Sequence, residues 1–269
     1  MAAEPGAGTQ AVERAMSLLA CFTDESSELR VSELCTRTGL GQSTVSRMVA
    51  SLERLGFLAQ DTRTGLYRLG PTQVTLGSVG LNSSPVFRAA RQTAQNLAHV
   101  ADLGANLAEF HGDQLFYLGN FEGGKSPKSF TMAGRSAPLH ATAMGKTLLL
   151  TQTSQYIHDY YAKGLGIAYT PHTITDPFAM ESALAETRSR GYATEIEELA
   201  FGRACVAAPI RGRGGAVVAA LSVSGPLSEL DDERRQRELS LMVIEAADEV
   251  SVALGFIVTR APQPRVPLG

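Results

Sequence analysis

The stretch VSELCTRTGLGQSTVSRMVASLERLGFLAQDTRTGLYRLG, from Val31 to Gly70, decides the fold of the first part of the chain. Ser32 can cap a short helix that ends at Thr38, and Gly39 suits the tight reversal that follows because glycine adopts positive φ without strain. Apolar residues then recur at steps of three and four, which indicates the buried face of a second helix. These residues are Val45, Met48, Val49, Leu52 and Leu55.

Short polar side chains gather at the amino-terminal end of this second helix, and two short apolar runs follow it at residues 57–60 and 66–69. The runs are separated by Asp61-Thr62-Arg63-Thr64-Gly65, and a glycine near the turn indicates a β-hairpin. Helix, tight turn, helix and hairpin together predict a winged helix-turn-helix over residues 10–70. The alternative is an ordinary small helical domain with a polar face.

A winged helix-turn-helix binds double-stranded DNA by placing the first residues of its second helix against base edges in the major groove. Gln, Ser, Thr and Arg side chains can read those edges, and an arginine at the tip of the wing can reach a phosphate or the minor groove. The candidate DNA-binding residues are Ser32, Gln42, Ser43, Thr44, Ser46, Arg47, Arg63 and Thr64.

The charge of the chain limits how it can bind DNA. The 269 residues carry a net charge of -3 at pH 7, so the protein is not a generally basic nucleic-acid coat. From Leu29 to Gly70, however, six arginines stand against three acidic residues, which leaves a small local excess of positive charge. We therefore expect modest non-specific affinity, and specific binding that needs two copies of the domain.

The chain offers no pattern for a metal, a cofactor or a membrane span. Its three cysteines, Cys21, Cys35 and Cys205, are far apart and form no CxxC pair, which predicts neither a zinc site nor a disulfide framework. The start MAAEPGAGTQ lacks a basic segment followed by an apolar run, so a signal peptide is not expected. No apolar run is long enough to span a membrane. A cytoplasmic protein is the simplest interpretation.

Breaks in the pattern divide the chain. A first helix is predicted from Ala11 to Phe22. Pro71 can begin another helix that reaches about Leu81, and residues 82–85 then break it. The predicted parts are a disordered start at 1–9, the winged helix-turn-helix at 10–70, a linker helix or hinge at 71–85, a second domain at 86–258 and a flexible tail at 259–269.

Residues 86–258 alternate between helical and strand patterns. Helices are predicted at residues 86–102, 140–151, 154–162, 176–190 and 228–256. Strands are predicted at residues 106–110, 114–121, 125–134, 192–199, 204–211 and 216–224. Hairpins and helices in this order predict an α+β fold, with an antiparallel sheet and helices on its faces.

Three segments of this second domain carry polar groups where a ligand could bind. Residues 134–146 run from a turn into the start of a helix, whose free backbone N–H groups can attract an anion. Residues 191–198 hold three carboxylates just before an apolar strand, and Ser222 and Ser224 share one strand face by the two-residue period. Each segment also has a simpler interpretation. Residues 134–146 could be an ordinary helix start, the three carboxylates could lie on a solvated edge, and Ser222 and Ser224 could lie on an outward-facing polar strand face.

No catalytic motif is recognisable. The chain lacks G-x-S-x-G, a Gly-rich phosphate loop and HExxH. His140 and Cys205 could pair as base and nucleophile, but no third residue that would orient them is evident. Cys205 begins a strand expected to be buried, where a small core residue is the commoner role. We therefore do not expect an enzyme.

Five pieces of the sequence form a specific set when taken together. They are the helix-turn-helix and wing ending in Tyr67-Arg68-Leu69-Gly70, PLHATAMGK at 138–146, RGYATEIEE at 190–198, CVAAPI at 205–210 and ALSVSGP at 220–226. They come in the order and spacing of the IclR family of bacterial transcriptional regulators, which the chain resembles over nearly its whole length.

The resemblance implies a winged-helix domain followed by a GAF-like α/β effector-binding domain, in a homodimer or homotetramer that binds operator DNA. It also implies that a small organic acid or aromatic catabolite modulates that binding, and repression is the family's common mode. By position, the ligand carboxylate would meet the amides of Ala143 and Met144. The candidate effector-binding residues are Ala143, Met144, Glu195, Cys205, Ser222 and Ser224. The alternatives are an activator of a catabolic operon, and a ligand-sensing module or enzyme without a DNA-binding role.

Overall fold

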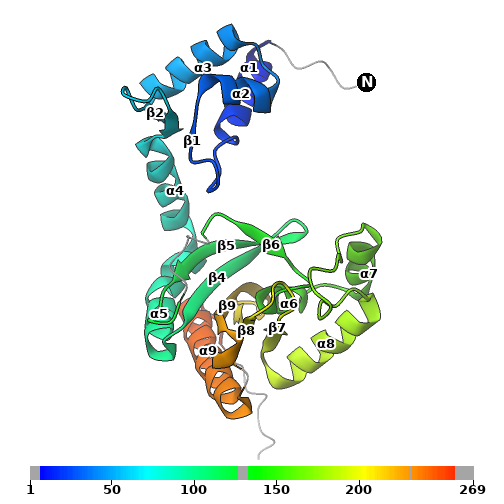
Figure 1. Cartoon of the computed structure of the whole chain (residues 1–269). Helices are drawn as coiled ribbons and strands as arrows, with labels where there is room; N and C mark the ends of the chain where they lie inside the picture. Colours follow the sequence, from blue (N-terminus) through cyan, green and yellow to red (C-terminus); the bar gives the residue numbers. More distant parts are fainter. Residues whose placement is uncertain (1–6, 127–132, 231, 258–269) are drawn as a thin grey trace, which may run out of the picture. The chain divides into compact units, whose positions relative to one another are not determined.

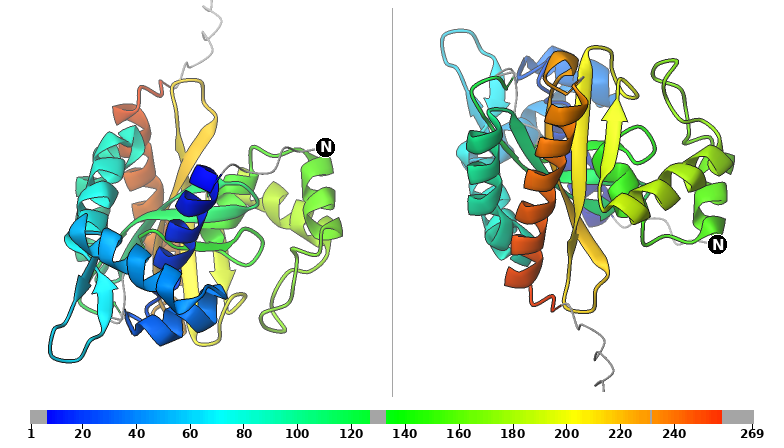
Figure 2. Two further views of the ribbon diagram at one scale, coloured as in Figure 1. Left: turned by 90° about the horizontal axis from the view of Figure 1, so that it is seen from above. Right: turned by 90° about the horizontal axis from the view of Figure 1, so that it is seen from below.

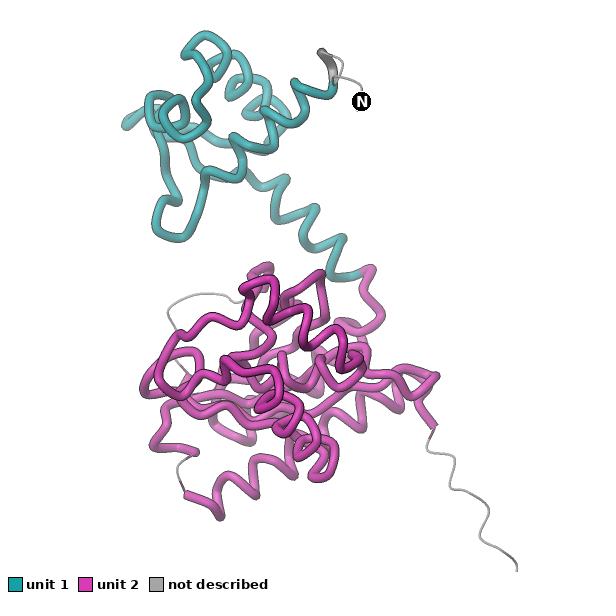
Figure 3. The backbone as a smooth tube through the Cα atoms, turned by 90° about the vertical axis from the view of Figure 1, so that its right-hand side faces the viewer, with its two compact units in different colours: residues 1–82 teal, residues 83–269 magenta. Residues whose placement is uncertain are grey.

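The computed structural model describes residues 7–126, 133–230 and 232–257 (Figure 1). The chain forms two compact units, residues 1–82 and residues 83–269, which Figure 3 colours separately. Disorder was predicted for residues 1–9, and this is wrong for residues 7–9, which belong to a helix. The rest of that segment and the tail at 259–269 lie outside the described residues. Among the described helices, none is both long enough and apolar enough to cross a membrane.

The first unit is a winged helix-turn-helix. Its elements are α1 (Ala7–Leu19), β1 (Glu28–Leu29), α2 (Val31–Thr38), α3 (Gln42–Arg54), β2 (Leu58–Gln60), β3 (Tyr67–Leu69) and α4 (Pro71–Ser83). The three strands pair antiparallel in the order β1-β3-β2. Leucine and valine side chains from α1, α2, α3 and the strands β1 and β2 form its core. These residues are Leu18, Leu29, Leu34, Val45, Val49, Leu52 and Leu58.

The tight turn between α2 and α3 forms at Gly39, as predicted. Gly39 has a φ of 68° and its N–H donates to Cys35 O at 2.9 Å, which ends α2. The prediction that Ser32 caps α2 is wrong, because Ser32 lies inside the helix and the capping position is Arg30. The Arg30 N–H donates to the Glu33 carboxylate at 2.7 Å. A carboxylate in the first turn satisfies a free amide and suits the helix dipole.

The second unit is built on one six-stranded sheet. Its strands are β4 (Gly104–His111), β5 (Gln114–Phe121), β6 (Ser136–Pro138), β7 (Ala193–Ile196), β8 (Arg203–Arg211) and β9 (Val217–Pro226). All neighbouring strands pair antiparallel, in the order β6-β5-β4-β9-β8-β7. The last strand in the described part of the chain, β9, therefore lies in the middle of the sheet, between β4 and β8.

Helices cover both faces of this sheet. They are α5 (Pro85–Ala101), α6 (Ala143–Leu149), α7 (Ser154–Ala162), α8 (Pro177–Arg190) and α9 (Glu233–Ala253), with a 3₁₀ turn at Leu227–Glu229. The long helices α5 and α9 lie side by side on one face, as Figure 1 and Figure 2 show, and α6 lies on the other. The predicted α+β fold, an antiparallel sheet flanked by helices, is confirmed.

The helix α6 begins later than predicted. The helix expected from His140 starts at Ala143 because Thr142 caps it, with Thr142 Oγ1 accepting the N–H of Gly145 at 3.0 Å. The preceding backbone passes so close to this helix that a Cβ on Gly145 would lie 2.1 Å from Leu139 O. Only glycine fits there, so Gly145 fixes how α6 packs against the chain before it.

The strand predicted at residues 125–134 is wrong in its described part. Lys125 lies in a turn, where its N–H donates to Asp102 O at 3.0 Å, and β6 begins only at Ser136. Residues 127–132 of this prediction lie outside the described residues. A long-range hydrogen bond therefore replaces the strand pairing that the local pattern suggested.

The two terminal helices differ from the prediction at their ends. Helix α1 spans Ala7–Leu19 instead of Ala11–Phe22. Helix α9 begins at Glu233 instead of Ser228, because Asp232 caps it by accepting a backbone N–H in the first turn. Side-chain caps thus decide helix ends that apolar periodicity alone leaves open.

Candidate DNA-binding surface and effector cavity

The amino-terminal half of α3 presents polar side chains to solvent. Val45 and Val49 are fully buried in the core of the first unit, whereas Gln42, Ser46 and Arg47 on the other side of the helix are exposed. Of the predicted DNA-binding residues, those exposed are Ser32, Gln42, Ser43, Ser46, Arg47 and Arg63, and those partly buried are Thr44 and Thr64. This division into a buried and a polar face leaves α3 available to a DNA groove.

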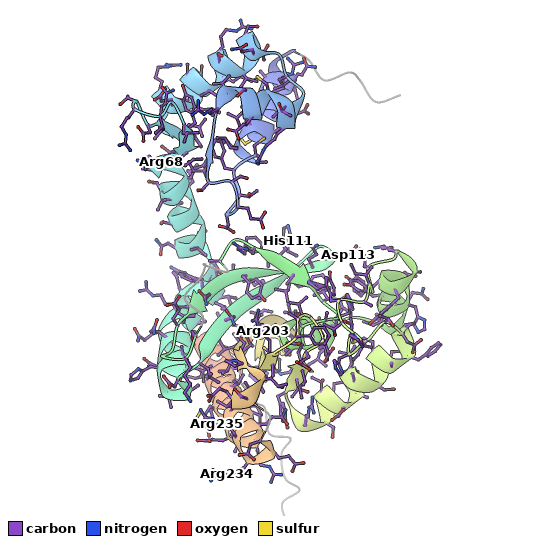
Figure 4. All side chains as sticks on the ribbon, viewed as in Figure 1. Arg68, His111, Asp113, Arg203, Arg234 and Arg235 are labelled. Atoms are coloured by element: carbon purple, nitrogen blue, oxygen red, sulfur yellow. The ribbon has the colours of Figure 1, made fainter. Side chains whose placement is uncertain are left out.

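The wing is the turn between β2 and β3. The Asp61 carboxylate accepts the backbone N–H groups of Arg63 at 2.8 Å and Thr64 at 3.3 Å, and Gly65 has a φ of 73°. These contacts hold a tight turn that exposes Arg63. Arg68 on β3 was not among the predicted DNA-binding residues, but it is exposed and adds positive charge to the same small sheet (Figure 4).

A cavity of about 280 Å³ lies on the face of the large sheet that α6 covers. The register in which β7, β8 and β9 pair determines which side chains form the floor of this cavity. Glu195 on β7 pairs with Cys205 on β8, and Cys205 pairs with Ser224 on β9, so the three side chains stand in one row. Met144 and Leu199 contribute apolar wall. The cavity therefore combines hydrogen-bonding groups with apolar surface, as small-molecule sites commonly do.

The cavity gathers most of the predicted effector-binding residues. Those that border it are Met144, Glu195, Cys205 and Ser224. Ala143 and Ser222 are not on its border. Ala143 is fully buried in α6, and Ser222 is fully buried one row further along the sheet, opposite Asn106. The Ser222 hydroxyl has no hydrogen-bond partner among the described residues, although it lies near enough to the Cys205 thiol to lower that group's pKa.

Several residues of the border were not predicted from the sequence, among them Asn106, Tyr117 and Arg203. Asn106 Nδ2 donates to Ser224 Oγ at 3.1 Å across the β4–β9 pair. That contact joins strands far apart in the chain, so no local pattern could reveal it. Arg203 could have been found, because it lies two residues before Cys205 and hence on the same face of β8.

Glu195 is buried at the cavity wall. Its Oε1 accepts the backbone N–H of Glu198 at 2.7 Å and that of Leu199 at 3.2 Å. Burial raises the pKa of Glu195, while these two hydrogen bonds and the charge of Arg203 act in the opposite direction. The carboxyl group can therefore accept a hydrogen bond from a ligand or, when protonated, donate one.

Cys205 and His140 do not form a nucleophile–base pair. His140 Nδ1 lies 3.0 Å from Tyr160 Oη and its Nε2 lies 2.8 Å from Ile167 O, so both ring nitrogens are engaged. Burial raises the pKa of Cys205 to about 12, and the nearby Glu195 charge adds to the effect. Cys205 therefore offers the cavity a neutral thiol rather than a thiolate.

A buried ion pair holds the segment that carries Glu195. Lys146 on α6 pairs with Glu198, both side chains being buried, and Lys146 Nζ also donates to Thr194 O at 2.9 Å. The Thr173 hydroxyl donates to Glu198 O at 2.6 Å. Two of the three carboxylates in residues 191–198 thus turn inward, which favours the ligand-site interpretation of this segment over a solvated edge.

Two family models match the chain. The model described as the IclR helix-turn-helix domain matches residues 11–62, and that described as the bacterial transcriptional regulator IclR C-terminal matches residues 79–252. The HTH-type transcriptional regulator BhcR of Paracoccus denitrificans is 33% identical over 254 residues, 94% of this chain and 90% of that protein. The transcriptional repressor IclR of Escherichia coli is 29% identical over 259 residues, 95% of this chain and 94% of that protein.

A solved structure shares the fold. IclR of Thermotoga maritima matches with a TM-score of 0.80 at 26% identity, over 92% of this chain and 100% of that chain. The named relatives are transcriptional regulators and not enzymes. The matched family models also coincide with the two structural features described above, the exposed face of α3 and the domain that contains the cavity. The chain belongs to the IclR family of DNA-binding bacterial transcriptional regulators.

Proposed function

We propose that the protein is an operator-binding repressor whose affinity for DNA is modulated by a small organic acid or aromatic catabolite. The observation that carries this proposal is the cavity of about 280 Å³, whose wall combines the buried Glu195 and the charged Arg203 with apolar side chains. Liquid water occupies roughly 30 Å³ per molecule, so the space suits a ligand of about ten non-hydrogen atoms. Small catabolites such as organic and aromatic acids are of this size.

The DNA-binding part of the proposal rests on α3 and the wing. Gln42, Ser46 and Arg47 would read base edges, and Arg63 would contact the phosphate backbone. Two copies of the chain, in a homodimer or homotetramer, would present two α3 helices to half-sites at a fixed spacing. A repressor is favoured over an activator because relatives such as the Escherichia coli protein are named as repressors.

The proposed control is a shift between two arrangements of the dimer. An effector that binds one arrangement more tightly moves the population toward it, by an amount set by the difference in affinity. Residues 71–85, which include Gly77 and Gly80, would absorb the change. Because half-sites require one spacing, a small change in the distance between the two α3 helices would alter operator affinity.

The test begins by selecting an operator from random duplexes with the purified full-length protein. Operator affinity is then measured with and without each member of a panel of small carboxylic acids, and transcription is measured in vitro. We expect at least one acid to change the affinity about tenfold or more, and the protein to lower transcription from a promoter that contains the operator. Acids that bind the protein but leave operator affinity unchanged would contradict the switch, and increased transcription would identify an activator.

Variants separate the DNA-binding role from a sensing module without one. Gln42→Ala together with Arg47→Ala removes two exposed polar groups of α3, and we expect operator affinity to fall at least about tenfold. Arg234→Gln serves as the matched control, because this arginine is 95% exposed on α9. Unchanged operator binding by the double variant would mean that α3 does not read DNA.

A further inference from the structure

Arg203 brings a positive charge without an internal partner to the border of the cavity. It is the first residue of β8 and shares a strand face with Cys205, two residues later. Among the described residues, none forms an ion pair or side-chain hydrogen bond with its guanidinium. A guanidinium presents several N–H donors in a planar fork that matches a carboxylate. The side chain is therefore available to a ligand anion.

The electrostatic effect of Arg203 falls on the cavity wall. Burial raises the pKa values of Glu195, Cys205 and Tyr117, and the charge of Arg203 partly offsets this rise; all three residues border the cavity. Arg234, by contrast, stands at the start of α9 with its side chain almost fully in solvent (Figure 4). Arg203 is also exposed, but it borders the cavity and thus contributes positive potential at the place where an effector would bind, whereas Arg234 does not border the cavity.

Glu195 favours the opposite kind of ligand group from Arg203. Its carboxylate would repel an anionic group and attract a hydrogen-bond donor. Glu195 pairs with Cys205 in the sheet, and Arg203 lies two residues from Cys205, a step of about 7 Å along a strand. Arg203 and Glu195 form no ion pair with each other, so a ligand can lie between them. Met144 and Leu199 supply apolar surface to the same cavity.

We propose that Arg203 binds the anionic group of the effector and that Glu195 accepts a hydroxyl at the far end, so that the cavity selects small hydroxylated carboxylic acids with an apolar middle. This assignment rests on the proposed function, since it concerns the same cavity. It differs from the orientation that family resemblance implies, in which the carboxylate meets the amides of Ala143 and Met144. Arg203 is then the residue that determines which effectors this chain accepts.

The experiment measures binding of three probes to the full-length protein by calorimetry. The probes are 4-hydroxybenzoate, its neutral isostere 4-hydroxybenzamide, and benzoate, which lacks the hydroxyl. We expect the wild type to bind 4-hydroxybenzoate about tenfold more tightly than either of the other two. Arg203→Gln should remove the preference for the acid over the amide, and Arg203→Lys should retain part of it. Glu195→Gln should reduce the preference for the hydroxylated acid over benzoate.

Arg234→Gln is the control and should bind all three probes as the wild type does. Circular dichroism and thermal melting of Arg203→Gln verify that the variant is folded, as expected for an exposed position. The proposal is overturned if no probe binds the wild type, or if Arg203→Gln keeps the preference for the acid, in which case another group, such as Arg135 or the Ala143 and Met144 amides, binds the carboxylate. Probes that bind through Arg203 but leave operator affinity unchanged would contradict the proposed function and leave this assignment standing.

Discussion

Lys146 and Glu198 form a buried ion pair between α6 and the segment that follows β7. The pair stands one contact away from the cavity, because the Glu198 N–H donates to the Glu195 carboxylate at 2.7 Å. Burial raises the pKa of Glu198, and Lys146 opposes that rise. The second carboxylate oxygen of Glu198 is buried without a hydrogen-bond partner among the described residues. Lys146 therefore stabilises the negative charge of the Glu198 carboxylate, which would be unfavourable in the protein interior without a partner.

Replacing Lys146 by methionine should be strongly destabilising. The variant leaves the Glu198 carboxylate buried and unpaired, and breaking a buried pair in this way costs about 3–5 kcal/mol. We expect that decrease in the free energy of unfolding, measured by urea denaturation near pH 7. The double variant Lys146→Met with Glu198→Leu should recover most of the loss, because it removes both charges.

A matched control comes from the surface. Lys163 pairs with Asp113 at 3.1 Å, and its side chain is 56% exposed. Lys163→Met should therefore cost less than about 1 kcal/mol, since exposed ion pairs are screened by water and salt. Equal losses for the two lysine variants would show that burial of the Lys146 pair has no energetic consequence.

His140 should make stability depend on pH. Burial lowers the pKa of His140 from 6.5, and its neutral ring fits the geometry if Nε2–H donates to Ile167 O while Nδ1 accepts from Tyr160. At pH values below about 6.5 the unfolded state then binds more protons at this site than the folded state does. The stabilising contribution is present above that pH and is lost as the pH falls.

Unfolding measured at several pH values between 5 and 7 tests this expectation. Glu109, Glu195 and Glu198 have pKa values raised by burial and contribute a slope of opposite sign at acidic pH. The relevant quantity is therefore the difference between the wild type and His140→Gln, in which the carboxylate contributions cancel. We expect this difference to shrink as the pH falls, and a difference independent of pH would refute the assignment.

Two glycine substitutions should change stability in opposite directions. A Cβ on Gly145 would lie 2.1 Å from Leu139 O, so Gly145→Ala forces α6 and the preceding backbone apart and should cost about 1–3 kcal/mol. Gly77 lies within α4 with no neighbouring atom near its Cβ position, and Gly77→Ala should raise helix stability by about 0.5–1 kcal/mol. Thermal melting of both variants distinguishes a steric requirement from a general effect of alanine.

Arg63 should contribute to DNA affinity without sequence preference. Its exposed position in the wing turn suits a phosphate contact, and each such contact contributes about 0.9 to the slope of log affinity against log salt concentration. Arg63→Gln should weaken operator and random duplexes by similar factors and reduce that slope by about one. A loss confined to the operator sequence would instead indicate that Arg63 reads bases.

Local sequence patterns predicted best those parts of the fold that form between residues close in the chain. The apolar period of α3, the turn at Gly39 and the hairpin of the wing each depend on residues close in the chain, and all three were predicted. The cap at Arg30 was not, because a Glu33 carboxylate competes with the serine that would usually fill that role. The two-residue strand β1 was also missed, since only its pairing with β3 makes it a strand.

The residues of the cavity show what local sequence patterns cannot predict. Local patterns indicated the carboxylate segment that holds Glu195 and the strand face of Ser224, and the family resemblance added Cys205; the sheet places the three side chains in one row. Asn106 enters that group only because β4 pairs with β9, a contact that no local periodicity contains. Arg203 shares a strand face with Cys205 by the two-residue period, but the sequence did not indicate it as a cavity residue, because a charged residue at a strand end is usually exposed, as Arg203 is.

The high pKa of Cys205, about 12, also has a chemical consequence for the cell. Peroxide and electrophiles attack the thiolate form of cysteine, and a pKa raised this far leaves the Cys205 side chain almost entirely in the thiol form at neutral pH. The Cys205 thiol in the cavity wall therefore resists oxidation and alkylation. Under the proposed function, this position of the cavity would keep its chemistry, and hence its fit to an effector, during oxidative stress.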